Sequence, residues 1–373
     1  MPGWKPPDMT ALPTRKLEAW RYTDLRPLTG ITFATPPALS APDLPSLDLP
    51  RLVFLNGAAA PEFSADLPFA GAFVPPDAED VLPLAQINAA AARDGATLSV
   101  PAGQDAGALL LFAQAGGETA FAMHPRHRIV LGEGAHLTLI EIAKGNGEYW
   151  HNPVFDIALA KGARLEHVRV QQESEAAFSL CTIRAEIGEG AAYEHFTAAI
   201  GARISRTEIH ATLVGEAARA DVNAVELLRG TQHADVTTII RHQAAGCPSR
   251  QVVKAVLADD ARGVFQGRVE VAPGAQKTDA YQMTRALLLS PRAEMDIKPE
   301  LEIFADDVKC SHGATIGALD DEQLFYLRSR GIDELTARAM LVRAFLDDAL
   351  APVEQPQARG LLDEAIESWW RRS

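Results

Sequence analysis

The sequence predicts a mainly β protein, with a parallel β-helix core flanked by an N-terminal helical and proline-rich region and a C-terminal helical domain. Short β-type runs follow one another from about residue 97 to 305 and show no long helical periods. A Gly-Ala turn recurs among them at a fixed spacing, and the pattern changes to that of helices after Gly317. We therefore expect three parts, residues 1–95, 96–318 and 319–373.

The N-terminal part is rich in proline, as in the stretch PPALSAPDLPSLDLP. It contains one short helical candidate, TRKLEAWRYTDL, in which Leu17, Trp20 and Leu25 lie on roughly one face. A second helix is expected from Asp80 to Asp94, with Gly95 as its C-terminal cap.

The central part contains a repeat of 28 residues, marked by the glycines of GEGAHL, AKGARL and GEGAAY. Apolar residues after these turns align in three columns, Leu137/Leu165/Tyr193, Ile140/Val168/Phe196 and Ile142/Val170/Ala198. In a parallel β-helix each coil buries its inner face against its neighbours, so we expect these columns to stack inside the coils. A β-sandwich is the rival fold, but it would not explain the fixed spacing.

The C-terminal part contains three helical patterns. The first, DDEQLFYLRSRG, ends at Gly331, and the second, DELTARAMLVRAFLDDAL, is stopped by Pro352. The second helix carries an apolar stripe formed by Leu335, Ala339, Val342, Leu346 and Ala349. The last helix ends in a Trp369-Trp370 pair that looks exposed. So much apolar surface on a small helical part predicts docking on another molecule.

Composition and charge exclude several classes of partner. Among the 373 residues, 35 Lys and Arg stand against 49 Asp and Glu, a formal net charge of −14. Nonspecific binding to nucleic acid or to an anionic membrane depends on Lys and Arg, so neither partner is expected. Three widely separated cysteines do not resemble a secreted disulfide framework, and no apolar run is long enough to span a bilayer. We expect a soluble, cytoplasmic protein.

Several common catalytic signatures are absent from the sequence. It contains no G-x-x-x-x-G-K-[ST] phosphate loop, and no G-x-S-x-G, H-E-x-x-H or C-x-x-C motif. The chain is therefore not expected to hydrolyse a nucleotide by itself.

Four histidines have spacings that invite a metal hypothesis. His167 and His195 occupy the same offset of the repeat and would lie close together in stacked coils. Two nitrogens are too few for a closed zinc site, and ladders of identical residues are ordinary in β-helices, so a structural role is favoured. His124 and His127 of HPRH have ligand-like spacing, but a proline-broken loop is the preferred interpretation.

The segment Cys310-Ser311-His312 carries the main site hypothesis. Residues two apart in a strand point to the same side, and a neighbouring histidine can lower the pKa of a thiol. This arrangement would suit transient binding of sulfur or iron. Alternatively, Cys310 packs in the last coil and His312 caps a turn at Gly313, and the spacing leaves both interpretations open. Because two ligands cannot close a metal site, a metal or cluster would need ligands from another chain.

Three segments resemble a known family. KLEAWRYTDL, KTDAYQMTRALLLSPRAEMDIKPELEIFADDVKCSHGATIG and LFYLRSRGI are similar to the SufB/SufD family of the bacterial SUF iron–sulfur cluster assembly machinery. The resemblance is dense over residues 277–332, and the DDVKCSHGAT string favours the SufD branch. The middle of the chain resembles the family only in its repeat character.

The resemblance implies a right-handed parallel β-helix that acts as a non-catalytic scaffold subunit of the SufBCD complex. It implies pairing with a SufB-like subunit through the last coils and docking of a SufC-like ABC ATPase on the C-terminal helices. Cys310 and His312 match the family's Cys-x-His, which places them at the SufB interface, with His312 as the participant. No cofactor is expected in the isolated chain, and a transient iron–sulfur cluster is expected in the complex. A homodimer through the same coils stays open.

For the ATPase contact, the stripe of the second C-terminal helix is the expected surface. It comprises Leu335, Ala339, Val342, Phe345 and Leu346.

A β-helix polysaccharide lyase or hydrolase is the strongest alternative of another class. Asp306-Asp307 and His312-Gly313 would be its acids and histidine. They lie along one strand, whereas a site on the side of a β-helix draws its groups from successive coils. A cupin-type metal enzyme is less favoured still, because no H-x-H occurs.

Overall fold

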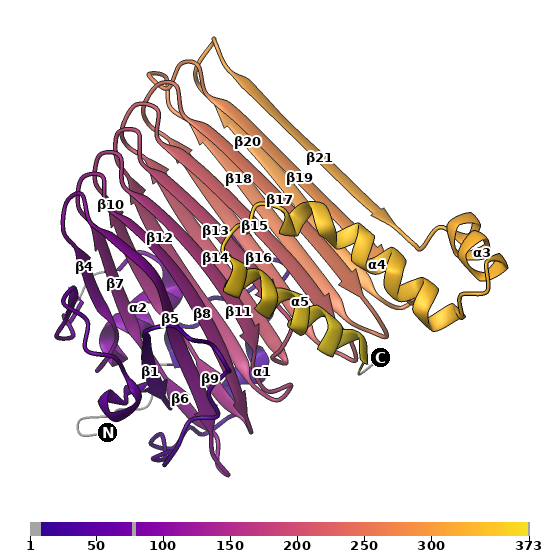
Figure 1. The fold of residues 1–373 in the computed structure, drawn as a ribbon, viewed down its shortest axis with the longest axis horizontal. Coiled ribbons are helices and arrows are strands. Elements are labelled where there is room, and N and C mark those ends of the chain that lie inside the picture. Colours follow the sequence, from indigo (N-terminus) through magenta and orange to yellow (C-terminus); the bar gives the residue numbers. More distant parts are fainter. Residues whose placement is uncertain (1–8, 77–79, 372–373) are drawn as a thin grey trace.

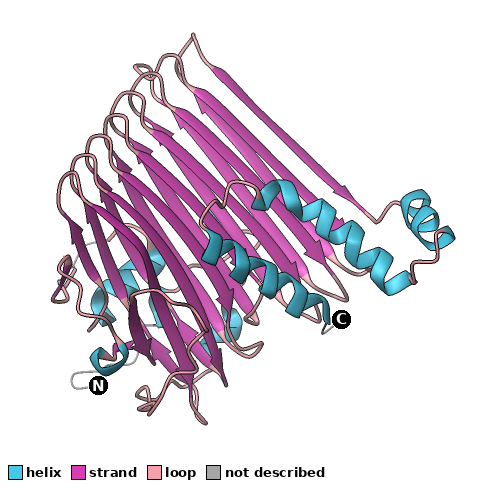
Figure 2. Cartoon of the chain, viewed as in Figure 1, coloured by secondary structure: helices cyan, strands magenta, loops and turns pink. Residues whose placement is uncertain are grey.

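The computed structural model describes residues 9–76 and 80–371. A stack of parallel coils forms the body of the molecule, and two helices cross one of its faces (Figures 1 and 2). The coils make a parallel β-solenoid of about 8 turns, with two large sheets as opposite walls.

Ten strands form the first sheet, and the neighbours in it are parallel except for the β1–β2 hairpin. In spatial order they are β2 (Ala58–Ala59), β1 (Arg51–Leu55), β5 (Asp105–Gly116), β8 (His136–Asn146), β11 (Arg164–Gln172), β13 (Ala192–Ala199), β15 (Arg219–Leu228), β17 (Pro248–Leu257), β19 (Asp279–Leu288) and β21 (Lys309–Gly317).

The second sheet runs in the opposite spatial direction through the same coils. Its strands are β20 (Glu294–Ile303), β18 (Arg262–Val271), β16 (His233–His242), β14 (Ile204–Leu213), β12 (Phe178–Ile187), β10 (Val154–Leu159), β7 (Arg126–Leu131), β4 (Thr97–Val100) and β3 (Ala70–Gly71). Two short strands, β6 (Phe121–Met123) and β9 (Tyr149–His151), pair beside the start of β12.

The 28-residue repeat is confirmed by the strand register. Leu165 of β11 pairs with Leu137 of β8 on one side and with Tyr193 of β13 on the other. The turn glycines have positive φ angles, 64° at Gly134 and 65° at Gly162. Residues with a Cβ are disfavoured in that left-handed conformation, which explains why glycine recurs there.

Only one of the three aligned columns lies inside the solenoid. The column that starts at Leu137 belongs to the inner apolar core. The columns that start at Ile140 and Ile142 lie on the outer face of the first sheet, because successive side chains of a strand alternate between its faces. The expectation of three inner columns is therefore wrong for two of them.

Helices from the C-terminal part cover these outer columns. They are α3 (Asp321–Ser329), α4 (Glu334–Leu350) and α5 (Pro356–Arg371). Figure 1 shows α4 and α5 lying across the first sheet, with α3 beyond the end of β21. The side chains of Asp320 and Asp333 cap α3 and α4 by accepting hydrogen bonds from backbone N–H groups.

Trp369 is buried, contrary to the expectation of an exposed tryptophan pair. Its side chain is only 1% exposed, and the guanidinium of Arg229 lies 4.6 Å from the centre of its ring. Trp370 is partly buried beside it.

The N-terminal segment departs from the predicted helix. Over TRKLEAWRYTDL the chain forms only a 3-10 turn at Glu18–Trp20, followed by the short α1 (Arg26–Thr29). Contacts with the second sheet decide this conformation. Trp20 packs under the guanidinium of Arg206 at 4.0 Å, and the Thr23 hydroxyl lies 3.0 Å from Nε2 of His233.

The second predicted helix forms, but over fewer residues. Helix α2 spans Pro83–Ala91, and Ala92 is its C-terminal cap instead of Gly95. Gly95 serves a different need, because a Cβ there would lie 1.7 Å from the backbone oxygen of Arg126. Residues 77–79, just before this helix, lie outside the described residues. Two further 3-10 turns occur at Met9–Ala11 and Pro61–Phe63.

None of the helices within residues 9–76 and 80–371 is long and apolar enough to cross a membrane.

Candidate functional site

The last coil of the solenoid is open. Strands β20 and β21 end their sheets, and no further strand of the described chain pairs with either. Large apolar side chains are exposed at this end, with Ile303 40%, Phe304 67% and Ile316 50% accessible. An uncovered strand edge with apolar side chains is a surface on which another chain can add.

Cys310 and His312 both lie on β21, at this open end, and on the same face of the strand. Their register partners on β19 are Ala280 and Gln282, which are 2% and 1% exposed. The two side chains therefore continue inner columns of the solenoid, at the position where no further coil covers them. Cys310 is half-buried, whereas His312 is exposed.

His312 does not cap a turn. Gly313 lies within β21 and pairs with Met283 of β19, so the chain remains extended on both sides of His312. The turn-cap interpretation is therefore wrong.

The thiol of Cys310 is not activated by its neighbour. Burial raises the pKa of Cys310, a hydrogen bond involving the Ala280 backbone lowers it, and the charge of Asp279 raises it again. The net direction is upward, so the thiol stays protonated near neutral pH. The expectation that His312 lowers this pKa is not met, because desolvation dominates.

His312 is the last member of a file of side chains that we call the inner column. Its members pair in register from coil to coil, and they are Leu139, His167, His195, Val222, Gln251, Gln282 and His312. The histidines and glutamines of the column before His312 are all at most 2% exposed. A largely polar file thus runs along the interior and reaches the surface at the open end.

The stacked histidine pair is structural. The rings of His167 and His195 lie 4.8 Å apart, and the Tyr193 hydroxyl lies 3.3 and 3.2 Å from their Nδ1 atoms. Burial lowers the pKa of His167 to about 3, so its imidazole is neutral. Across the described ranges no group of three or more His, Cys, Asp or Glu is arranged to hold a metal ion.

The HPRH histidines are also buried and do not lie in an exposed loop. His127 accepts a hydrogen bond from the Ala96 backbone N–H at 3.0 Å and stacks on Phe155, and His124 contacts the side chain of Asn152 at 3.1 Å. Burial lowers the pKa of each to about 3.

Sequence reasoning missed Gln251 and Gln282 as members of the inner column. The fixed spacing of 28 residues that revealed His167 and His195 does not continue after β13, because the later coils differ in length. Only the pairing of the strands identifies which later residues share the column.

The predicted docking stripe of α4 is divided by the fold. Val342 and Leu346 are 2% and 0% exposed, because they pack on the outer columns of the first sheet. Ala339 and Phe345 are partly buried, and Leu335 is 60% exposed. Val342 and Leu346 are thus used to attach the helix to its own chain.

Other apolar side chains of the same helices remain exposed. Phe325 and Tyr326 of α3 are 73% and 57% exposed, and Met340 of α4 is 46% exposed. Together with Leu335 they form a patch that we call the helical patch. A hollow of about 690 Å³ between α4 and α5 has Met340 on its lining.

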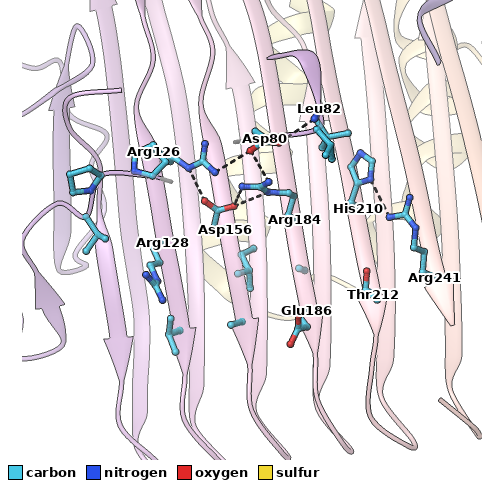
Figure 3. Close-up of a pocket in the computed structure, with 18 residues that line it drawn as sticks. Asp80, Leu82, Arg126, Arg128, Asp156, Arg184, Glu186, His210, Thr212 and Arg241 are labelled. Carbon is cyan, nitrogen blue, oxygen red and sulfur yellow. Dashed lines mark hydrogen bonds and ion pairs between the residues drawn. The ribbon is translucent and has the colours of Figure 1, made fainter. Parts of the chain in front are cut away.

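A larger hollow of about 800 Å³ lies on the outer face of the second sheet (Figure 3). Its arginines are mostly committed to acids. Arg184 binds Asp80 at 2.7 Å and Asp156 at 2.5 Å, and Arg126 binds Asp156 at 2.8 Å and Asp80 at 3.4 Å. This cluster anchors the chain just before α2 to the sheet, and no predicted site residue lines the hollow.

The acid pair of the alternative enzyme hypothesis lies on the turn before β21. Asp307 forms an ion pair with Lys277 and accepts a hydrogen bond from the Lys277 backbone N–H at 2.7 Å. Both acids are accounted for as part of an exposed turn, and they do not face His312 across successive coils.

Comparison with known proteins identifies similar chains. A family model described as "SUF system FeS cluster assembly, SufBD core domain" matches residues 112–345. The chain is 33% identical to the iron-sulfur cluster assembly protein SufD of Escherichia coli over 355 residues, 90% of this chain and 84% of that protein.

Two further relatives agree with this match. A SufBD family protein of Synechocystis, slr0076, is 30% identical over 393 residues, covering 95% of this chain and 87% of the relative. The chloroplastic protein ABCI7 of Arabidopsis thaliana is 36% identical over 247 residues, covering 65% of this chain and 51% of the relative.

Proposed function

The chain belongs to the SufBD family of SUF-system iron–sulfur cluster assembly proteins, and from this premise we propose that it is a non-catalytic scaffold subunit of a SufBCD-type complex. The observation that carries the proposal is the open last coil, which presents His312 beside uncovered strand edges. Family membership also removes the support for the polysaccharide-degrading alternative.

The open end is proposed to pair with a SufB-like subunit. The last strands offer unpaired backbone groups, and Ile303, Phe304 and Ile316 offer apolar area around them. Strand addition satisfies the backbone groups, and burial of the apolar side chains supplies binding free energy. A second copy of this chain could use the same edges when the partner is absent.

His312 is proposed to face the nascent cluster at that interface. Its imidazole is exposed at the edge of the terminal coil, so a partner chain that covers this end would enclose it. One imidazole cannot hold a cluster, which requires several ligands, so the remaining ligands would come from the partner. Cys310 keeps a protonated, half-buried thiol and is assigned to packing, unless partner binding changes its surroundings.

A SufC-like ABC ATPase is proposed to dock on the C-terminal helices. We assign the contact to the helical patch of Phe325, Tyr326, Leu335 and Met340, because these apolar side chains project from α3 and α4 into solvent. Partly exposed Ala339 and Phe345 lie beside it. ATP hydrolysis would then belong to the partner, which agrees with the absence of a phosphate loop in this sequence.

Co-expression with the SufB-like and SufC-like proteins of the same organism tests the proposal. We expect one complex on size-exclusion chromatography that gains iron and sulfide in equal amounts when cluster assembly is reconstituted. The same reconstitution with a His312→Ala chain should give an intact complex with several-fold less iron and sulfide. A chain that elutes apart from both partners would contradict the scaffold assignment.

A further inference from the structure

We propose that Gln282 positions the imidazole of His312, by accepting a hydrogen bond from one of its ring N–H groups. The other ring nitrogen is then left with its lone pair directed away from the solenoid, toward whatever covers the open end. The role of the positioned nitrogen rests on the proposed function of His312, whereas the hydrogen bond itself does not.

The register places the two side chains next to each other. Gln282 of β19 pairs with His312 of β21, and the two strands lie side by side at the end of the first sheet (Figure 1). Neighbouring parallel strands are about 4.8 Å apart, so two side chains on the same face are within hydrogen-bonding reach. Gln282 is 1% exposed and His312 is exposed, which makes this pair the boundary between the interior and the open end.

The orientation of the Gln282 amide follows from its other neighbour. Its Nε2 donates to Oε1 of Gln251 at 3.4 Å, and the same oxygen accepts a hydrogen bond from the Thr238 hydroxyl at 2.5 Å. An amide oxygen can only accept, so Gln282 must direct its NH₂ group toward Gln251. The Thr238–Gln251–Gln282 chain therefore fixes which end of the Gln282 amide faces inward.

The opposite end of that amide lacks a partner. Oε1 of Gln282 is buried and has no hydrogen-bond partner in the described part of the chain. Buried carbonyl oxygens are nearly always paired, so this one indicates a donor that is not yet engaged. The exposed imidazole of His312 is the register neighbour that carries such a donor.

Space for this amide is provided by a glycine of the facing sheet. A Cβ on Gly267 of β18 would lie 2.0 Å from Nε2 of Gln282. Any larger residue at this position would displace the Gln282 side chain, so the interior of the last coils is shaped to hold the amide.

The chemical consequence is a fixed tautomer. A neutral imidazole carries one N–H and one lone pair, and a hydrogen bond from the N–H decides which nitrogen remains able to bind a metal. Gln282 would thus act as a positioning residue: it contacts His312 and need not contact the cluster.

The direct test is nitrogen NMR of the full chain labelled with ¹⁵N-histidine, recorded where His312 is neutral. Loss of a signal in His312→Asn assigns the residue. In the wild-type chain we expect one protonated and one bare ring nitrogen, whereas Gln282→Met should give the averaged signals of an imidazole that exchanges between tautomers. Gln282→Glu retains an acceptor oxygen and should keep His312 out of free exchange.

Thr284→Val is the matched control. Thr284 is the next inner residue of β19, is 1% exposed and pairs with Ala314 instead of a histidine. This change should leave the His312 signals unaltered. Averaged His312 signals in the wild-type chain, or unchanged signals in Gln282→Met, would overturn the inference. If Gln282→Met fails to fold, the wild-type and Gln282→Glu spectra decide alone.

Cluster content of the reconstituted complex separates this inference from the proposed function. Iron and sulfide should fall several-fold with Gln282→Met, recover with Gln282→Glu and stay normal with Thr284→Val. Normal content with His312→Ala would refute the proposed role of His312, while the NMR result would still decide whether Gln282 holds its imidazole.

Discussion

Leu335 and Val342 lie on the same helix, α4, but Leu335 is 60% exposed whereas Val342 is 2% exposed and packs with the outer columns of the first sheet. The helix therefore uses one part of its apolar stripe to attach to the solenoid and leaves another part at the surface. The two positions should respond to substitution in opposite ways.

Leu335→Asp should weaken binding of the SufC-like ATPase by about tenfold or more, because it places a charge in a desolvated contact. The melting temperature of the chain should not change. Binding is measured by a pull-down titration with the purified ATPase. Unaltered affinity would move the contact away from the helical patch.

Val342→Asp should instead destabilise the chain itself, by roughly 3 kcal/mol, because a buried carboxylate would have no partner against the first sheet. Chemical denaturation measures this free energy of unfolding. A stable Val342→Asp chain that fails to bind the ATPase would restore the original assignment of the whole stripe to docking.

Ile316→Asp should prevent pairing with the SufB-like subunit. Ile316 is 50% exposed at the edge of the last strand, so the isolated chain should melt normally while the complex no longer forms on size-exclusion chromatography. Val214→Asp is the control, since Val214 is 40% exposed in the turn after β14, away from the open end. Loss of the complex in both variants would indicate a nonspecific effect.

His312→Ala should leave unfolding within about 0.5 kcal/mol of the wild type, because the side chain is exposed and does not cap a turn. Iron and sulfide in the reconstituted complex should fall several-fold. Ser311→Ala, an exposed neighbour on the other face of β21, should have neither effect. Full cluster content in the His312→Ala complex would place the chemistry wholly in the partner.

Cys310→Ser should show the reverse pattern. The half-buried thiol packs with apolar side chains of the last coils, so a hydroxyl there should cost about 1 kcal/mol of stability. Cluster content should remain normal. A complex that keeps its stability but loses iron and sulfide would instead identify Cys310 as a ligand.

Stability of the isolated chain should fall in acid because of His167. Burial lowers the pKa of this histidine from 6.5 to about 3, so the unfolded chain binds the proton more readily than the folded chain between these values. The stabilisation is complete above pH 6.5 and is lost progressively as the pH falls toward 3.

Thermal melts from pH 7.5 to pH 4 measure this dependence. His167→Gln should reduce the slope, whereas His136→Gln, at an exposed position at the start of β8, should not. Equal slopes in all three chains would assign the acid sensitivity to other groups.

Much of the fold follows from the sequence because its causes are local. The repeat near Gly134, Gly162 and Gly190 records a turn that requires positive φ, and the apolar columns record neighbouring coils of equal length. The helical pattern after Gly317 likewise reflects periodicity and caps, such as Asp320 and Asp333, that act within a few residues. These features predicted the β-helix and its C-terminal helices correctly.

Tertiary structure decided what covers each apolar face. An apolar pattern shows that a side chain is to be buried, but not by which neighbour, so Ile140 and Ile142 proved to lie beneath other segments of the chain instead of inside the coils. For the same reason Val342 and Trp369 proved to be buried within the chain. At the N-terminus, contacts of Trp20 and Thr23 with the second sheet outweigh local helix propensity.

The site shows the same division. Sequence alone singled out Cys310 and His312, because their spacing puts them on one face of a strand. It could not show that His312 ends a polar inner column or that Gln282 lies next to it, since coil lengths vary after β13 and only strand pairing fixes the register. Residues 30 positions apart in the chain become neighbours only through the hydrogen bonds between β19 and β21.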